Sequence, residues 1–178
     1  MRLRRNRHER AGFQLYAAAV SAARDPWFYA TMGVPDTLDG RFDILSLFTF
    51  LLIERLRLAP APGPALAQSV FDAMFSDMDV NLREMGVGDL SVGKKVKAMW
   101  NAFHGRATAY GAALSNNDLA TLEDAVARNV WRGAGAPVDA VAAVARMIQA
   151  QHDYLGTQKL DVLAAGHVLF LPAAEAAT

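Results

Sequence analysis

The fold is decided by the stretch Ile44-Leu45-Ser46-Leu47-Phe48-Thr49-Phe50-Leu51-Leu52-Ile53, in which almost every side chain is apolar. Apolar residues fill nearly every position until Glu54, which is typical of a helix that is buried on most of its sides. We therefore expect a helix over about 40–58 at the centre of the domain. The apolar run is about half the roughly 20 residues that a membrane-spanning helix needs, so no transmembrane span is predicted.

Helical patterns lie on both sides of this central segment. Before it, apolar residues recur every three or four positions from Phe13 to Ala23, and Asp25-Pro26 ends that helix. No alternating strand pattern is present. The sequence thus predicts an all-α, compact single domain of about six helices. The four helices that follow the central one are expected from Leu66 to Gly86, from Ser91 through Tyr110, from Asn117 or Asp118 to near Gly133, and from Pro137 or Val138 to Gly156.

Two apolar segments do not fit a regular helix. The stretch 27–41 begins with three aromatic residues and contains two glycines, so we expect an irregular segment that lies pinned against the domain. The stretch 160–169 is apolar and is interrupted by Gly166, which is compatible with a short helix and with an extended end.

The composition excludes several classes of function. Lys plus Arg and Asp plus Glu number 18 each, so there is no basic excess that would favour nucleic acid as the main partner. The absence of cysteine excludes disulfides, thiol catalysis and Cys-ligated zinc, and it agrees with a reducing, cytoplasmic location. The hydrophobic content of 53% is compatible with a hydrophobic binding face.

The first ten residues, MRLRRNRHER, are strongly basic. They lack the apolar stretch and cleavage site of a secretory signal. We expect a disordered basic arm over 1–10, a helical domain over 11–172 and a tail over 173–178. The arm is a candidate for contact with a ribosome or with the anionic inner face of the plasma membrane, and the alternative is a solubilising terminus without a partner. Its five basic residues are Arg2, Arg4, Arg5, Arg7 and Arg10.

Motifs that imitate catalytic or metal sites are incomplete. The segment 88–95 nearly matches the motif of a phosphate-binding loop. Lys95, however, occupies the position where the motif needs a Ser or Thr hydroxyl, and a helix is predicted before the segment where the motif needs a strand. Asp77 and Asp79 imitate a calcium loop that then lacks its glycine and its final glutamate. The four histidines are scattered, and no G-x-S-x-G elbow occurs. We predict no catalytic centre, no metal and no cofactor.

Two charged segments that are also rich in large apolar residues, 34–43 and 77–86, are the candidate functional region. Their charges could pair locally, with Asp36, Asp39 and Asp43 around Arg41, so that loss of Arg41 would destabilise the fold. In the second segment, Arg83 could pair with Asp79 one helical turn away. The functional alternative is that they rim a groove with an apolar floor. The candidate groove residues are Val34, Asp36, Asp39, Arg41, Met74, Met78, Asp79, Arg83, Glu84, Met85 and Asp89.

Methionines are numerous in this region. Met74, Met78, Met85 and Met99 offer deformable apolar surface of the kind that permissive binding proteins use. Methionine also fills cores, and we expect about two of the four to do so.

The stretches VPDTLDGRFD (34–43), MFSDMDVNLREMGVGDLSVGKKVK (74–97) and AFHGRATAY (102–110) resemble signatures of the ubiquinol-cytochrome c chaperone family, in the family's order and approximate spacing. The similarity extends from about residue 16 to 170 and is closest to the short bacterial form, which lacks the long targeting extension of mitochondrial relatives. The resemblance implies an all-α chaperone that binds newly made cytochrome b during assembly of the bc1 complex, and not an enzyme.

Two other classes of function fit the same apolar groove. One is a small helical protein or enzyme that binds an isoprenoid or quinone. The other is a scaffold that packs in a complex without releasing its client. A co-purified quinone would favour the first, and slow exchange of cytochrome b peptides would favour the second.

Overall fold

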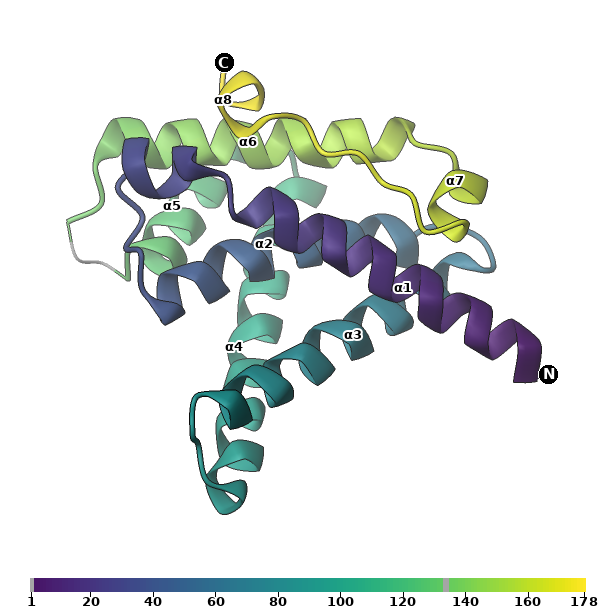
Figure 1. Cartoon of the computed structure of the whole chain (residues 1–178). Coiled ribbons are helices and arrows are strands. Elements are labelled where there is room, and N and C mark those ends of the chain that lie inside the picture. Colours follow the sequence, from purple (N-terminus) through teal and green to yellow (C-terminus); the bar gives the residue numbers. More distant parts are fainter. Residues whose placement is uncertain (1, 133–134) are drawn as a thin grey trace.

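The computed structural model describes the backbone of residues 2–132 and 135–178 and the side chains of 8–132 and 135–178. Over these residues the chain is helical and has no strand (Figure 1). Two of the helices, α7 and α8, are very short. In chain order the elements are α1 (Arg2–Ala23), the π-helical turn η1 (Trp27–Thr31), α2 (Leu38–Arg57), α3 (Gly63–Glu84), α4 (Asp89–Ser115), α5 (Leu119–Val130), α6 (Val138–Thr157), α7 (Leu160–Ala164) and α8 (Ala173–Ala176).

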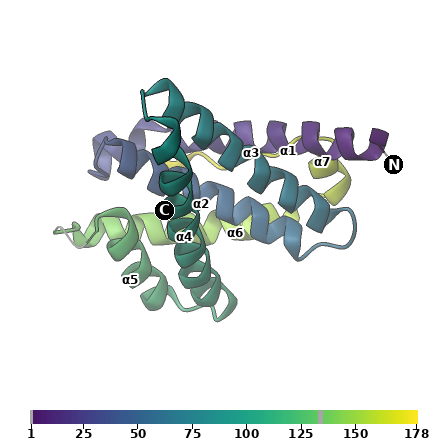
Figure 2. The same ribbon diagram turned by 90° about the horizontal axis from the view of Figure 1, so that it is seen from below.

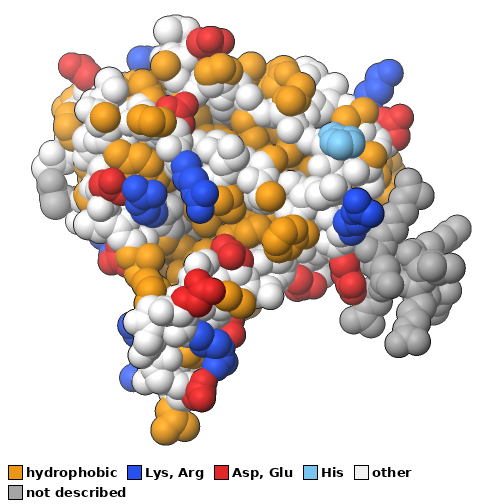
Figure 3. Space-filling view, in the orientation of Figure 1, with side chains coloured by type: hydrophobic (Ala, Val, Ile, Leu, Met, Phe, Trp, Pro, Cys, Tyr) orange, Lys and Arg blue, Asp and Glu red, His pale blue; other side chains and the backbone are white. Residues whose placement is uncertain are grey.

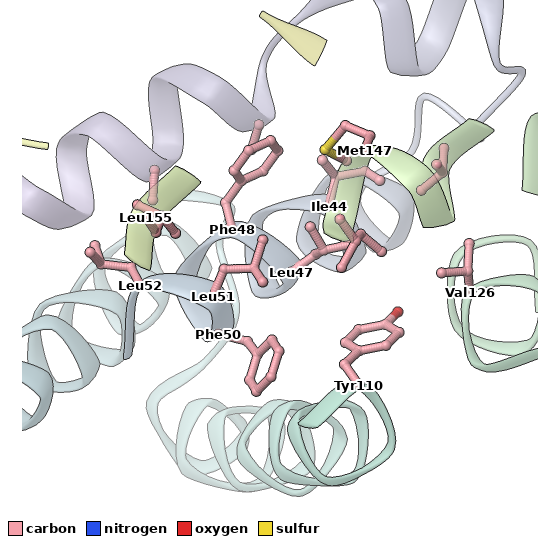
Figure 4. Close-up of a cluster of buried hydrophobic side chains, with 14 of the residues drawn as sticks. Ile44, Leu47, Phe48, Phe50, Leu51, Leu52, Tyr110, Val126, Met147 and Leu155 are labelled. Atoms are coloured by element: carbon pink, nitrogen blue, oxygen red, sulfur yellow. The ribbon is translucent and has the colours of Figure 1, made fainter. Parts of the chain in front are cut away.

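Helix α2 is the centre of the domain, as its sequence predicts. It contacts α1 and α3 on one side and α6 on the other, and it also touches α4 and α5 (Figure 2). Ile44, Leu47, Leu52 and Leu56 have no exposed surface. Figure 4 shows side chains of α2 that point in opposite directions, toward α6 and toward Tyr110 of α4. Most of the circumference of the helix is therefore buried.

The start of α2 depends on a cap and a close contact. The Thr37 side chain accepts a hydrogen bond from the Gly40 backbone N–H at 3.2 Å, which is an N-cap. A Cβ atom at Gly40 would lie 2.0 Å from the Pro35 carbonyl oxygen, so only glycine allows the preceding loop to lie on the first turn of α2.

The segment 27–41 is pinned against the domain, as expected, although it opens with the helical turn η1. Phe28 has no exposed surface, and its ring packs on Phe48 at 5.8 Å. The Trp131 Nε1–H donates to the Gly33 carbonyl at 3.3 Å. These contacts fix the loop that leads into α2.

Both chain ends differ from the sequence-based boundaries. Helix α1 begins at Arg2 and not near Phe13, so the backbone of 2–10 continues into the domain instead of forming a separate arm. At the other end, α8 packs on α6, and the Arg146 Nε–H donates to the Ala177 carbonyl at 2.9 Å. We therefore include 173–178 in the folded domain. The segment 160–172 combines both expected forms, α7 followed by an extended stretch.

The end of α3 and the start of α4 form a helical hairpin that projects from the body (Figure 1). Its tip is the turn between Glu84 and Asp89. The segment 88–95, which imitates a phosphate-binding loop, begins at the last residue of this turn and forms the first turns of α4. Leu90, just past the turn, is fully exposed. The hairpin diverges from α1 and α2 and leaves space between itself and the body.

We predict that Leu52→Ala lowers the free energy of unfolding by about 2–5 kcal/mol, because it removes a fully buried side chain from the most enclosed helix. Leu58→Ala, at the C-cap of the same helix, is the matched control, since Leu58 is 67% exposed. Its cost should stay within about 0.5 kcal/mol. Urea denaturation measures both, and equal losses for the two variants would contradict the central position of α2.

Candidate functional site

A groove of about 380 Å³ lies between the projecting hairpin and the body. It is lined by residues of both charged segments that the sequence singles out, together with the end of α1 and η1. The floor is apolar. The lining residues are Val20, Ala23, Arg24, Tyr29, Leu38, Arg41, Phe42, Leu45, Asp77, Met78, Asn81, Leu82, Glu84, Met85 and Met99.

The rims of the groove carry opposite charges. Arg24 and Arg41 lie on the side of α1 and α2, whereas Asp77 and Glu84 lie on α3. Figure 3 shows this face, with basic side chains above, acidic side chains on the hairpin below and hydrophobic surface between them. An occupant with an apolar surface and charges of both signs would complement this arrangement.

Arg41 is held at the rim by one carboxylate. Its Nε–H donates to Asp36 Oδ1 at 2.6 Å, and its guanidinium lies 5.2 Å from the Tyr29 ring centre. Half of each side chain of the pair is exposed, at 53% and 55%, so the ion pair is not the stabilising buried network that we expected. Asp39 does not belong to this pair and instead contacts Arg132 at 3.0 Å.

The second charged segment forms an ion cluster at the tip of the hairpin. The Arg83 Nε–H donates to Asp79 Oδ2 at 2.6 Å, and another guanidinium N–H of Arg83 donates to Asp89 of α4. The hydrogen bond from Arg83 lowers the pKa of Asp79. These three residues close the hairpin and do not line the groove. The Asp79–Arg83 pairing is the local pairing predicted from the sequence.

Two of the predicted groove residues belong to the core. Val34 is 2% exposed and Met74 is fully buried. Met78, Met85 and Met99 all line the groove. One of the four methionines is thus fully buried, where two were expected in the core. The deformable surface comes from the other three.

A buried ionic network behind the groove was missed by our sequence analysis. Asp43 of α2 is 1% exposed, accepts a hydrogen bond from Arg106 of α4, and lies 3.3 Å from a guanidinium nitrogen of Arg132. Burial raises the pKa of Asp43 to about 6, and the two arginines oppose that increase. The Arg106 guanidinium also lies 5.5 Å from the ring centre of Phe42 on the groove floor. The network therefore holds the floor against α4.

The residues that imitate a calcium loop have other partners. The Tyr16 hydroxyl donates to Asp77 Oδ2 at 2.7 Å, and burial together with this hydrogen bond raises the pKa of Tyr16. Within the described residues, no group of three or more His, Asp or Glu side chains could hold a metal ion, and no helix is long and apolar enough to cross a membrane.

The basic residues of the N-terminal segment are only partly described. The side chains of Arg2, Arg4, Arg5 and Arg7 lie outside the described residues. Arg10 is exposed.

The fold and the site together define an all-helical domain with a charge-rimmed, apolar groove. The comparisons with known proteins are more specific. The sequence pattern of the family described as ubiquinol-cytochrome C chaperone matches residues 30–170, and the chain belongs to this family. The three stretches on which the resemblance rests lie within the match.

Two relatives extend over nearly the whole chain. The crystal structure of the Cbp3 homolog from Brucella abortus superposes with a TM-score of 0.85 at 35% identity, covering 97% of this chain and 94% of that one. The ubiquinol-cytochrome-c reductase complex assembly factor 1 of Xenopus laevis is 20% identical over 166 residues, which is 93% of this chain and 82% of the relative. The fold is thus shared with a solved bacterial protein.

We predict that the buried ion pair Arg106–Asp43 stabilises the fold and that the exposed pair Arg41–Asp36 does not. Arg106→Ala should lower the free energy of unfolding by about 3–5 kcal/mol, because it leaves Asp43 buried beside a single, half-exposed arginine. Arg41→Ala should leave the melting temperature unchanged within error, since its pair with Asp36 is in water. Thermal and urea unfolding measure both. A large loss for Arg41→Ala, or none for Arg106→Ala, would contradict the assignment.

Proposed function

We propose that this protein is an assembly chaperone of the bc1 complex that holds an apolar segment of newly made cytochrome b in the groove between the α3–α4 hairpin and the body. The observation that carries the proposal is the groove itself, which joins an apolar floor to rims of opposite charge. The function is binding without catalysis and without a cofactor, in the cytoplasm or at the inner face of the plasma membrane.

Membership of the ubiquinol-cytochrome C chaperone family supports the assembly role. The Xenopus laevis relative carries the name of an assembly factor of the ubiquinol-cytochrome-c reductase complex. Cytochrome b is the occupant that we infer, because a subunit made of membrane helices exposes apolar side chains until it is assembled, and such segments need an apolar surface to cover them.

The methionines on the groove suit a client that must be released. Met78, Met85 and Met99 can adopt several rotamers at low cost and can therefore cover apolar side chains of different shapes. Binding then depends on apolar area more than on a fixed pattern of hydrogen bonds. Met85 is 52% exposed, so it is accessible to a client without rearrangement of the core.

The proposal is tested with tagged full-length chains expressed in cells that assemble a bc1 complex. The Met85→Glu variant should retain at least about tenfold less cytochrome b than the unaltered chain, as a charge facing an apolar client costs about 1.4 kcal/mol or more. Quantitative mass spectrometry of the captured proteins measures cytochrome b. The yield of assembled, active complex should fall in parallel.

Val138→Glu is the matched control, because Val138 is 81% exposed at the start of α6 and does not line the groove. An acidic residue is also favourable in the first turn of a helix. Equal retention of cytochrome b by the two variants would refute the groove as its site. A stoichiometric quinone extracted from the purified chain, lost in Met85→Glu, would favour a quinone-binding protein instead.

We also propose that the basic N-terminal segment localises the chaperone at an anionic surface. Each arginine near such a surface contributes about 1 kcal/mol at modest ionic strength. Replacing Arg2, Arg4, Arg5, Arg7 and Arg10 by glutamine preserves helix propensity and should abolish salt-sensitive binding to anionic vesicles or ribosomes. Co-sedimentation at low and high salt measures the effect.

The same five substitutions should leave capture of a cytochrome b peptide unchanged, because the described residues that line the groove begin at Val20. Vesicle and ribosome binding that persists at low salt after neutralisation would show that the segment has no localising role.

A further inference from the structure

The segment 166–172, which turns at Gly166 and is extended from His167 onward, lies between α1 and α6 (Figure 1). It is held on one side by two glutamines, Gln151 of α6 and Gln158 at the C-cap of the same helix. Gln151 is within the helix, whereas Gln158 has an extended backbone conformation just after its last turn, and both side chains reach the segment. Gln151 has no exposed surface.

Each glutamine pairs with the backbone of one residue in the segment. Gln158 Nε2–H donates to the Leu169 carbonyl at 2.7 Å, and the Leu169 N–H donates to Gln158 Oε1 at 3.0 Å. Gln151 makes the same two bonds with Leu171, at 2.7 Å and 3.0 Å. The two carboxamides thus replace a neighbouring strand along this edge.

The opposite edge of the segment is unpaired. In an extended chain, the N–H and C=O groups of one residue point to one side and those of the next residue to the other. Because Leu169 and Leu171 face α6, the backbone groups of Val168 and Phe170 face away from it. In the part of the chain that the structure describes, these groups have no hydrogen-bond partner.

A channel of about 540 Å³ lies along this free edge. Its far wall is formed by Ala18, Ser21 and Ala22 of α1, whose small side chains leave space beside the segment. Its floor is apolar, since Phe48 lines it and packs edge-to-face on Phe170 at 5.2 Å.

The segment approaches α1 closely at Gly166, and the channel continues into a second hollow that Gly166 also lines. A Cβ atom at Gly166 would lie 2.3 Å from Gln14 Oε1, so α1 and the segment touch there. A second hollow of about 490 Å³ shares Ala18, Val168 and Leu169 with the channel and extends it along the surface.

We propose that this channel binds an extended peptide segment of a partner protein, which adds to residues 168–171 as a strand. The free N–H and C=O groups of Val168 and Phe170 supply the ladder hydrogen bonds, and the apolar floor takes alternate side chains of the peptide. The occupant is an extended segment with apolar residues at alternate positions. The site is separate from the groove, and the proposal does not depend on the client of the groove.

A second copy of this chain is a poor occupant. Its own segment 166–172 already pairs with its α6 on one edge and lies beside its α1 on the other. Neither edge can enter the channel of another molecule unless the segment first leaves its own fold. A partner whose extended segment is free at its surface has no such requirement.

Amide hydrogen exchange of the full chain, followed by NMR, tests the proposal with the peptide acetyl-Thr-Val-Thr-Val-Thr-Val-amide as the probe. In the free protein the amides of Leu169 and Leu171 should exchange more slowly than those of Val168 and Phe170. The peptide should slow exchange at Val168 and Phe170 selectively. Two peptides that are N-methylated at alternate residues should differ, since only one set removes donors from the pairing edge.

Ser21→Trp should fill the channel from α1 and weaken peptide binding at least tenfold, because Ser21 is exposed and lines the channel. Ser115→Trp, at the exposed end of α4, is the matched control. The proposal is overturned if the peptide does not protect Val168 and Phe170, if both N-methylated peptides bind equally, or if Ser21→Trp binds as well as the control. Sedimentation that shows a dimer formed through this edge also overturns it.

Discussion

Helix α2 has almost no polar face from Ile44 to Ile53, so every side of it must be shielded from water. Five other helices provide that cover, and their paths follow from the requirement. The cover is incomplete where α3 and α4 diverge from the body. There Phe42 and Leu45 of α2 become the floor of the groove. The groove therefore exposes part of the central helix, and this is the surface that we propose for the client.

Asp43 is a buried charged residue in the first turns of α2, and its ion pairs fix the shape of the groove. A buried carboxylate is costly unless it is paired, and its partners Arg106 and Arg132 come from α4 and from the residue that follows the C-cap of α5. Arg132 has a φ of 53°, in the left-handed region, which is uncommon for a residue other than glycine. The contact therefore ties the start of α2 to two distant segments and orients Phe42.

The fold was predictable from the sequence because it depends on periodicity. The expected central helix and the four helices after it were found with small shifts in their ends, since a stripe of apolar residues and a cap such as Thr37 or Asp118 are local signals. The start of α1 was not predicted, because charged residues such as Arg2 to Arg7 carry no apolar stripe even when they are helical.

The site was predicted only in part, for a different physical reason. The sequence indicated which two segments face each other, and both line the groove. It could not separate core from surface within them, so Val34 and Met74 were placed at the groove although they are buried. Long-range partners were also missed. Two signals could have indicated them. One is Asp43, which stands beside a run of apolar residues, and the other is Gln151, which lies among the apolar residues of α6.

The last turn of α1 is shared by the groove and the channel. Ala23 faces the groove, Ser21 and Ala22 face the channel, and Arg24 lines both. A strand bound in the channel would fix this turn from one side, while a client in the groove contacts it from the other. Ligands that order the same element favour each other's binding, and the coupling is reciprocal. A partner protein in the channel would therefore strengthen retention of the client, and its departure would favour release, without any contact between partner and client.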